Sequence, residues 1–193
     1  QHSFDSYRIV MGEDFRDTEL VDSRPHLATL KIWQMPKAGG YYMLGADPAY
    51  GSSEWADRFA LEVYRCYADG IEQVAEFCTA ECNTYQFAWV IAYLAGAYGE
   101  NVMYNLEING PGQQVYEELK NLRRLALVEA PGSQFHHGLF NGLSKIHSCS
   151  YAKVDSLTGT PTAWHTQTNR SQKERMLAIM KDWFERGCLH IRS

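Results

Sequence analysis

The sequence lacks several features that would place it in a common class. No apolar run reaches the roughly 18 residues that a membrane span needs, and no GxxxxGK[ST] loop is present to bind the phosphates of ATP. The cysteines include no CxxC pair and no finger-like Cys/His spacing. We therefore interpret Cys78 and Cys82, four residues apart, as reduced buried thiols of a cytosolic protein rather than zinc ligands.

An excess of positive charge is also missing. The chain has 18 Lys and Arg against 23 Asp and Glu, which gives a formal net charge of -5 at pH 7. This balance argues against a protein that coats nucleic acid. It leaves a nuclease open, because such an enzyme gathers carboxylates around metal ions that restore positive charge locally. With 193 residues and 13% aromatic side chains, the chain is long enough to bury a core.

The first 40 residues differ from the remainder. They are polar and contain Pro25, Pro36 and the pair Gly39-Gly40, so we predict a linker or an arm packed on the main domain at 41–193. Residues 27–33 suit either a strand or a short helix. Because the chain has neither an initiator Met nor a signal peptide, we expect it to be part of a longer protein.

From residue 41 the hydrophobic pattern predicts an α/β domain with a mixed central sheet flanked by helices. The expected elements are strands at 41–46, 58–67 and 71–77, a helix at 84–98, a strand at 101–108, a helix at 113–124, a hairpin of 150–154 with 160–165, a helix at 171–186 and a strand at 189–191. Three strands in a meander followed by helix, strand and helix is the early order of an RNase H-like fold, although other α/β domains share parts of it.

Two carboxylates stand near the ends of apolar strands that we expect to be neighbours. Asp47 follows the run 41–46, and Glu107 comes just before the Gly-Pro-Gly loop at 110–112. Ionised carboxylates on buried strands are costly unless they are paired or bind metal, and two together repel without a cation between them. Divalent metals held this way can catalyse phosphodiester cleavage. We predict Asp47 and Glu107 as catalytic metal ligands; a turn Asp and a salt-bridged or solvent-facing Glu are the alternatives. Asp57 is a third candidate.

Motifs along the chain resemble, in order, the C-terminal nuclease domain of tailed-bacteriophage large terminases. The family patterns are G-x-D-x-A-x-G, an Asp opening the next strand, L-A-x-x-Y, v-E-x-N-x-x-G and a late W-x-T with a following Lys. The matching segments are Gly45–Gly51, Asp57, Leu94–Tyr98, Leu106–Gly112, and Trp164–Thr166 with Lys173. The resemblance covers about residues 41–193.

The resemblance implies an endonuclease of the RuvC/integrase-like superfamily that hydrolyses concatemeric double-stranded viral DNA at the start and end of packaging. It implies two Mg²⁺ or Mn²⁺ ions, with Asp47 bridging them, Glu107 as the second ligand, Asp57 in support and Asn109 at the rim. The implied partners are a portal protein, a small terminase subunit and an ATPase domain N-terminal to this one. The implied location is the host cytoplasm, with no membrane and no place in the mature virion.

Further residues are candidates for contacting DNA. Lys120, Arg123 and Arg124 form a small basic patch that could hold a DNA backbone, although the helix dipole alone favours cations there. Lys173 could face phosphate or be an ordinary solvated lysine. We expect His136, His137 and His147 to be surface loop residues.

The sequence departs from the family in one place. Large terminases carry a further Asp or Asp pair in a helix after the last strand, which we expect beyond Ser193. Two rival functions therefore stay open. One is another RNase H-like nuclease, of the Holliday-junction resolvase or transposase type. The other is a non-catalytic docking module whose carboxylates are only structural.

Overall fold

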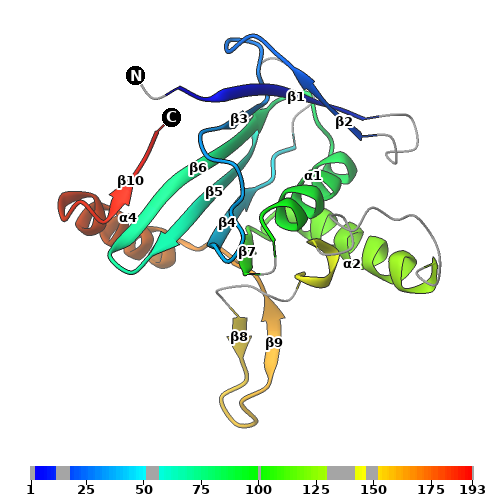
Figure 1. Ribbon diagram of the computed structural model, residues 1–193. Coiled ribbons are helices and arrows are strands. Elements are labelled where there is room, and N and C mark those ends of the chain that lie inside the picture. The colour runs from blue at the N-terminus through cyan, green and yellow to red at the C-terminus, as the bar shows by residue number, and fades with distance from the viewer. Residues whose placement is uncertain are drawn as a thin grey trace.

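A large mixed sheet positions every other part of the molecule (Figure 1). The computed structural model describes residues 3–11, 18–50, 57–99, 101–129, 142–146 and 152–192. Its strands are β1 (Asp5–Met11), β2 (Thr18–Asp22), β3 (Leu30–Ile32), β4 (Tyr41–Asp47), β5 (Phe59–Tyr67), β6 (Gly70–Thr79), β7 (Val102–Leu106) and β10 (Leu189–His190). The order is β2-β1-β3-β6-β5-β4-β7, and β10 also pairs with β6. The β4–β7 and β10–β6 pairs are parallel and the others antiparallel.

Three of these strands come from the N-terminal region that we predicted as a linker or a packed arm. β3 pairs with β6, β1 with β3, and β2 with β1, so these three strands extend the sheet on the far side of β6. Because these strands are hydrogen-bonded into the sheet, the region is a packed arm rather than a linker. Residues 30–32 form a strand, β3, and not a helix. How the chain divides into domains stays a prediction.

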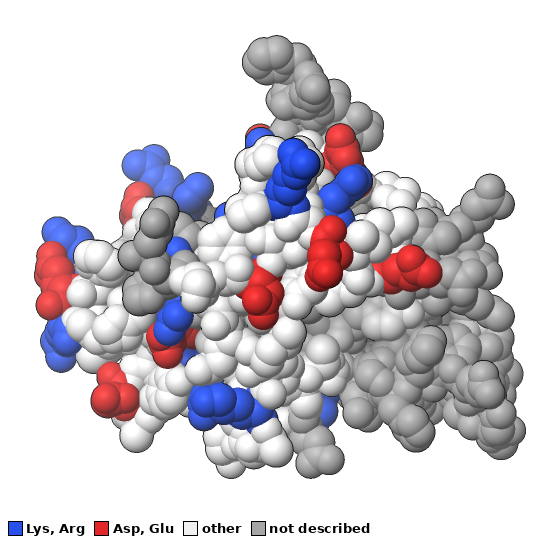
Figure 2. Space-filling view, turned by 45° about the horizontal axis from the view of Figure 1, so that its top comes forward, with Lys and Arg blue, Asp and Glu red and all other residues white. Residues whose placement is uncertain are grey.

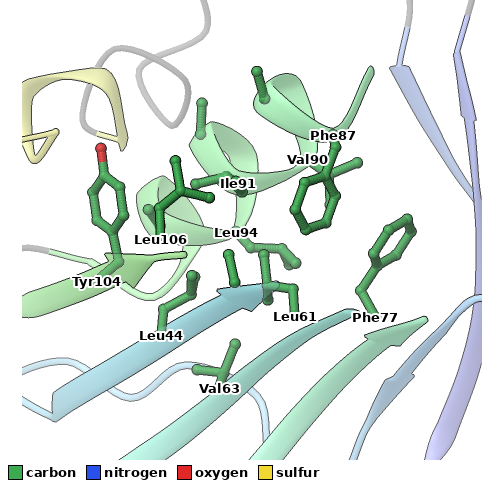
Figure 3. Packing of buried hydrophobic residues seen from close by; sticks show 14 of the residues in the cluster. Leu44, Leu61, Val63, Phe77, Phe87, Val90, Ile91, Leu94, Tyr104 and Leu106 are labelled. Atoms are coloured by element: carbon green, nitrogen blue, oxygen red, sulfur yellow. The ribbon is translucent and has the colours of Figure 1, made fainter. Parts of the chain in front are cut away.

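The core lies between one face of the sheet and two helices. Alternation along β4 buries Tyr42, Leu44 and Ala46, and side chains of β5, β6 and β7 point the same way, toward α1 (Thr84–Ala97) (Figure 3). α2 (Gly112–Glu129) packs on α1. Because α1 is covered by the sheet and by α2, nearly all of its side chains are apolar. Its N-terminus is a capping box of Asn83 and Gln86.

The late elements stand away from this core. β8 (Ala152–Val154) and β9 (Pro161–Trp164) form a hairpin that extends from the body (Figure 1). α4 (Arg170–Glu185) lies on the sheet side opposite α1 and α2, and Asn169 caps it. None of its residues is buried, so its apolar stripe is exposed: Met176, Leu177, Ile179, Met180, Trp183 and Phe184. In the part of the chain that the structure describes, no helix is both long and apolar enough to cross a membrane.

A partly buried carboxyl on β5 predicts a pH-dependent stability. Desolvation raises the pKa of Glu62 from 4.5 to about 7, and its Oε2 accepts a hydrogen bond of 2.6 Å from Gln73 Nε2. Between these two pKa values the folded protein holds a proton that the unfolded chain releases, so the contribution is present at low pH and is lost as pH rises through about 7.

We expect Glu62→Gln to remove this pH dependence, because the amide oxygen still accepts from Gln73 and carries no charge. Urea unfolding at about pH 5 and about pH 8 measures it, and the variant should gain stability over the wild type mainly at the higher pH. Glu174→Gln, an exposed control on α4, should leave the wild-type pH slope in place. Equal slopes in wild type and Glu62→Gln would contradict the assignment.

Candidate active site

Two of the predicted carboxylates meet where the parallel strands β4 and β7 end. Ala46 pairs with Leu106, and Glu107 N donates to Ala46 O at 2.9 Å. Ala46 and Leu106 both face the core. Because successive side chains on a strand point to opposite faces, the next residues, Asp47 and Glu107, project together from the other face of the sheet.

The electrostatics of Asp47 show which groups surround it. Desolvation is the largest cause raising its pKa, followed by the charge of Glu107, a hydrogen bond to the Glu107 side chain and the charge of Asp57; Lys173 opposes them. The structure therefore brings Asp47 and Glu107 into contact, with Asp57 and Lys173 close enough to act on Asp47 electrostatically.

Glu107 is held by the segment that follows β9. Thr166 forms a parallel bridge with Glu107, made by Ile108 N to Thr166 O at 2.9 Å and Thr166 N to Leu106 O at 3.0 Å. Asn109 Nδ2 donates to Glu107 Oε1 at 3.1 Å and to Thr168 O at 2.6 Å. The W-x-T motif and the E-x-N motif, 59 residues apart in sequence, thus form one support for the Glu107 carboxylate.

The Gly-Pro-Gly loop packs directly against the site. A Cβ on Gly112 would lie 1.8 Å from Glu107 O, and one on Gly110, whose φ is +53°, would lie 2.8 Å from the Tyr50 hydroxyl. At Gly112 the obstacle is backbone, so no side chain fits there, whereas at Gly110 the end of the Tyr50 side chain could move aside and the positive φ is what disfavours other residues. Glycine at both positions lets the loop turn sharply into α2 while its backbone touches Glu107.

Sequence reasoning missed the structural part played by His165. It is 1% exposed and has a φ of +70°. Its Nδ1 accepts from Leu106 N at 3.2 Å, and its Nε2 lies 2.8 Å from Ile146 O, so a proton on Nε2 satisfies both contacts. His165 joins the 142–146 segment to β7 beside the site. It occupies the variable position of the W-x-T motif, and no local pattern marks it.

The predicted DNA-contacting residues separate into two places. Lys173 lies beside the carboxylates, whereas Lys120, Arg123 and Arg124 lie on α2, on the other side of the sheet (Figure 1). Lys120 pairs with Glu117 at 2.6 Å, and Arg124 donates to Asn121. Their contact with DNA stays a prediction. His136, His137 and His147 lie outside the described residues.

The carboxylate pair fits a divalent cation that keeps ligands from solvent and substrate. Among the described residues, no group of three or more His, Cys, Asp or Glu side chains is arranged to hold a metal ion. Mg²⁺ commonly uses one or two carboxylates and completes its shell with water and phosphate oxygens. The charge of Glu107 contributes to the raised pKa of Asp47, and a cation between the two carboxylates would offset this repulsion. The chemistry of this donor set therefore suits Mg²⁺ or Mn²⁺.

The two cysteines that we interpreted as thiols are both free. Cys82 is buried, and burial raises the pKa of its thiol to about 12. Cys78 is half-buried on β6. A thiol with so high a pKa is a poor metal ligand and a poor nucleophile at neutral pH.

Comparison with known proteins gives a match at the level of structure. No protein-family model and no curated protein matches the chain. The large terminase nuclease from thermophilic phage G20c, solved with bound magnesium, is similar with a TM-score of 0.52 and 15% sequence identity. The match covers 88% of this chain and 65% of that chain. The predicted RNase H-like, mixed-sheet fold is confirmed: this chain has the fold of a large terminase nuclease.

Proposed function

We propose that the chain is the metal-dependent endonuclease domain of a viral DNA-packaging terminase, which cuts concatemeric double-stranded DNA when packaging starts and ends. One observation carries the proposal: the Asp47–Glu107 pair projects from the ends of two adjacent parallel strands. The fold of a large terminase nuclease and the magnesium bound by the G20c protein support it.

Each residue of the site has a role in this proposal. Asp47 and Glu107 would hold the Mg²⁺ or Mn²⁺ ions, and Asp57 would support them from the start of β5. The ions would supply a water nucleophile active at neutral pH and stabilise the charge of the phosphodiester. Asn109 keeps the Glu107 carboxylate in one orientation. Lys173, beside Asp47, is placed to attract a phosphate group.

The wider setting is part of the same proposal. Double-stranded viral DNA would be the substrate, and the portal protein, the small terminase subunit and an N-terminal ATPase domain would be the partners. The site of action would be the cytoplasm of the infected host cell. The likeness to a phage terminase nuclease supports this context.

Plasmid cleavage tests the activity. We expect nicking with Mn²⁺ or Mg²⁺ and none with EDTA, and we expect Glu107→Gln to slow it by about a hundredfold or more, because losing a metal ligand removes several kcal/mol of transition-state stabilisation. Glu117→Gln is the matched control, because Glu117 is an exposed carboxylate on α2. Cleavage that persists in EDTA would contradict the metal mechanism.

The choice of substrate separates the rivals. A packaging nuclease should cut linear duplex about as well as a four-way junction, whereas a resolvase should prefer the junction. A docking module should show neither cleavage nor any change in thermal stability when Mg²⁺ or Mn²⁺ is added.

A further inference from the structure

The carboxylate face of the sheet continues as a single row of residues across its middle. Asp47 pairs with Ala60, and Ala60 pairs with Cys78. Cys78 N donates to Thr29 O at 2.9 Å, which carries the β3–β6 register one residue further. Continuing the β1–β3 register by one residue sets Arg8 beside Thr29. Directly paired residues share a sheet face, so this row runs from Asp47 to Arg8 on the face away from the core.

The middle of the row is made of small side chains. Ala60, Cys78 and Thr29 are only partly exposed, and none of them rises far above the backbone. Of these, Thr29 and Cys78 form the floor of a groove of about 690 Å³, whose lining also includes Arg8, His26, Arg58 and Glu81. Ala60, which pairs with both Cys78 and Asp47, continues this floor from the groove toward the carboxylates. An extended polymer can lie close to the sheet along such a floor.

Positive charge stands at the borders of this groove. Arg8 and Arg58 are exposed, and neither forms an ion pair with a carboxylate among the residues that the structure describes. Glu81 is the acidic side chain of the lining. Figure 2 shows acidic and basic side chains interspersed over the face it displays, with no large patch of one sign. Two arginines in one groove that have no carboxylate partner within the described ranges are therefore a distinct local feature.

The spacing suits a nucleic acid strand that begins at the carboxylates. Four strand-to-strand steps separate Asp47 from Arg8, or about 19 Å at about 4.8 Å a step. Along the axis of duplex DNA each strand advances about 3.4 Å per nucleotide, so the row spans about five or six base pairs. Arg58 lies near the start of this path, since it directly precedes β5, the neighbour of β4.

We propose that this groove binds the phosphate backbone of the nucleic acid flanking the cleaved bond, with Arg58 and Arg8 as its phosphate contacts. The inference rests on the proposed function, because it takes the strand to start at Asp47 and Glu107. It assigns the DNA path to the carboxylate face rather than to the basic residues of α2. The small side chains of the floor leave room for the nucleic acid backbone. The two guanidinium groups set the direction in which that backbone crosses β5, β6, β3 and β1.

Binding of a fluorescently labelled duplex of about 20 base pairs, followed by anisotropy in EDTA, tests the proposal without cleavage. We expect Arg8→Gln/Arg58→Gln to weaken binding by about tenfold or more and to reduce the slope of log K against log salt by about 2. Glu81→Gln should tighten binding, because it removes the carboxylate of the groove. Arg123→Gln/Arg124→Gln on α2 is the control with the same loss of charge. Thermal melting confirms that each variant is folded.

The outcomes distinguish this proposal from the function on which it rests. If Arg8→Gln/Arg58→Gln binds like wild type while the α2 variant loses affinity, the groove is not the DNA path, even if metal-dependent cleavage is intact. If affinity and salt slope fall as expected but wild type never cuts DNA, the groove stands as a nucleic acid site and the nuclease proposal fails. Equal losses in both double variants would reflect net charge alone and overturn the assignment.

Discussion

Asp47→Asn is expected to abolish metal-dependent cleavage and, at the same time, to make the metal-free protein more stable. The two effects have one cause, because the carboxylate that would hold the metal is desolvated by burial and lies close to Glu107 and Asp57, and both circumstances raise its pKa. An acid with a raised folded pKa favours folding while protonated and loses that contribution as pH rises. At neutral pH the neutral amide removes the repulsion. We expect a loss of cleavage of at least about a hundredfold and a rise in melting temperature of a few degrees.

Plasmid nicking and thermal melting, with and without divalent metal, measure the two effects. Mg²⁺ or Mn²⁺ should raise the melting temperature of the wild type by mass action and leave that of Asp47→Asn almost unchanged. Asp69→Asn, in the exposed β5–β6 turn, is the matched control and should behave like wild type in both assays. If Asp47→Asn cut DNA at the wild-type rate, the site would have been placed wrongly.

Gly112→Ala is expected to have the second large effect, on stability as well as on cleavage. Its Cβ would stand 1.8 Å from Glu107 O, a backbone atom that cannot move aside by changing rotamer. Either the first turn of α2 or the backbone of Glu107 must shift. Overpacking of this kind costs about 1–3 kcal/mol, and a displaced Glu107 carboxylate should lower cleavage even at temperatures where the variant is folded.

Gly45→Ala is the matched control, because a Cβ on Gly45 of β4 meets nothing within 4 Å. Alanine there should be neutral or slightly stabilising, since glycine in a strand costs about 0.5–1 kcal/mol in entropy. Urea unfolding and plasmid cleavage compare the two variants. Equal stability and activity of Gly112→Ala and Gly45→Ala would show that the loop is looser than its backbone contact implies.

The sequence was sufficient to predict those elements whose burial produces a regular hydrophobic pattern. β4 alternates strictly and α1 is apolar on every covered side, so both were predicted close to their observed bounds. Asp47 and Glu107 could be placed together because each stands at the end of a buried strand. The outer strands were missed for the converse reason: Val10, Leu20 and Val21 are all more than 40% exposed, so burial imposes little pattern on β1 and β2.

The supports of the site were beyond sequence reasoning because they join distant segments. The contact of Asn109 with Thr168 spans 59 residues, as does that of His165 with Leu106. A buried histidine with a left-handed backbone has no local signature. The row from Asp47 to Arg8 likewise needs four strand registers at once, and one of its ends lies in the region predicted as a linker or arm.

β6 also has a consequence for how the chain reaches its final form. It accepts β3 along part of one edge and β10 along another part, and Arg192 N donates to Gln73 Oε1 across 119 residues. During synthesis, β4 to β7 and α1 can collapse as soon as they emerge, since their contacts are comparatively local. The β10 contact forms only after a far longer stretch of chain has been made, and it has a larger loop to close. We therefore expect β10 to dock onto a sheet that already carries the carboxylate pair.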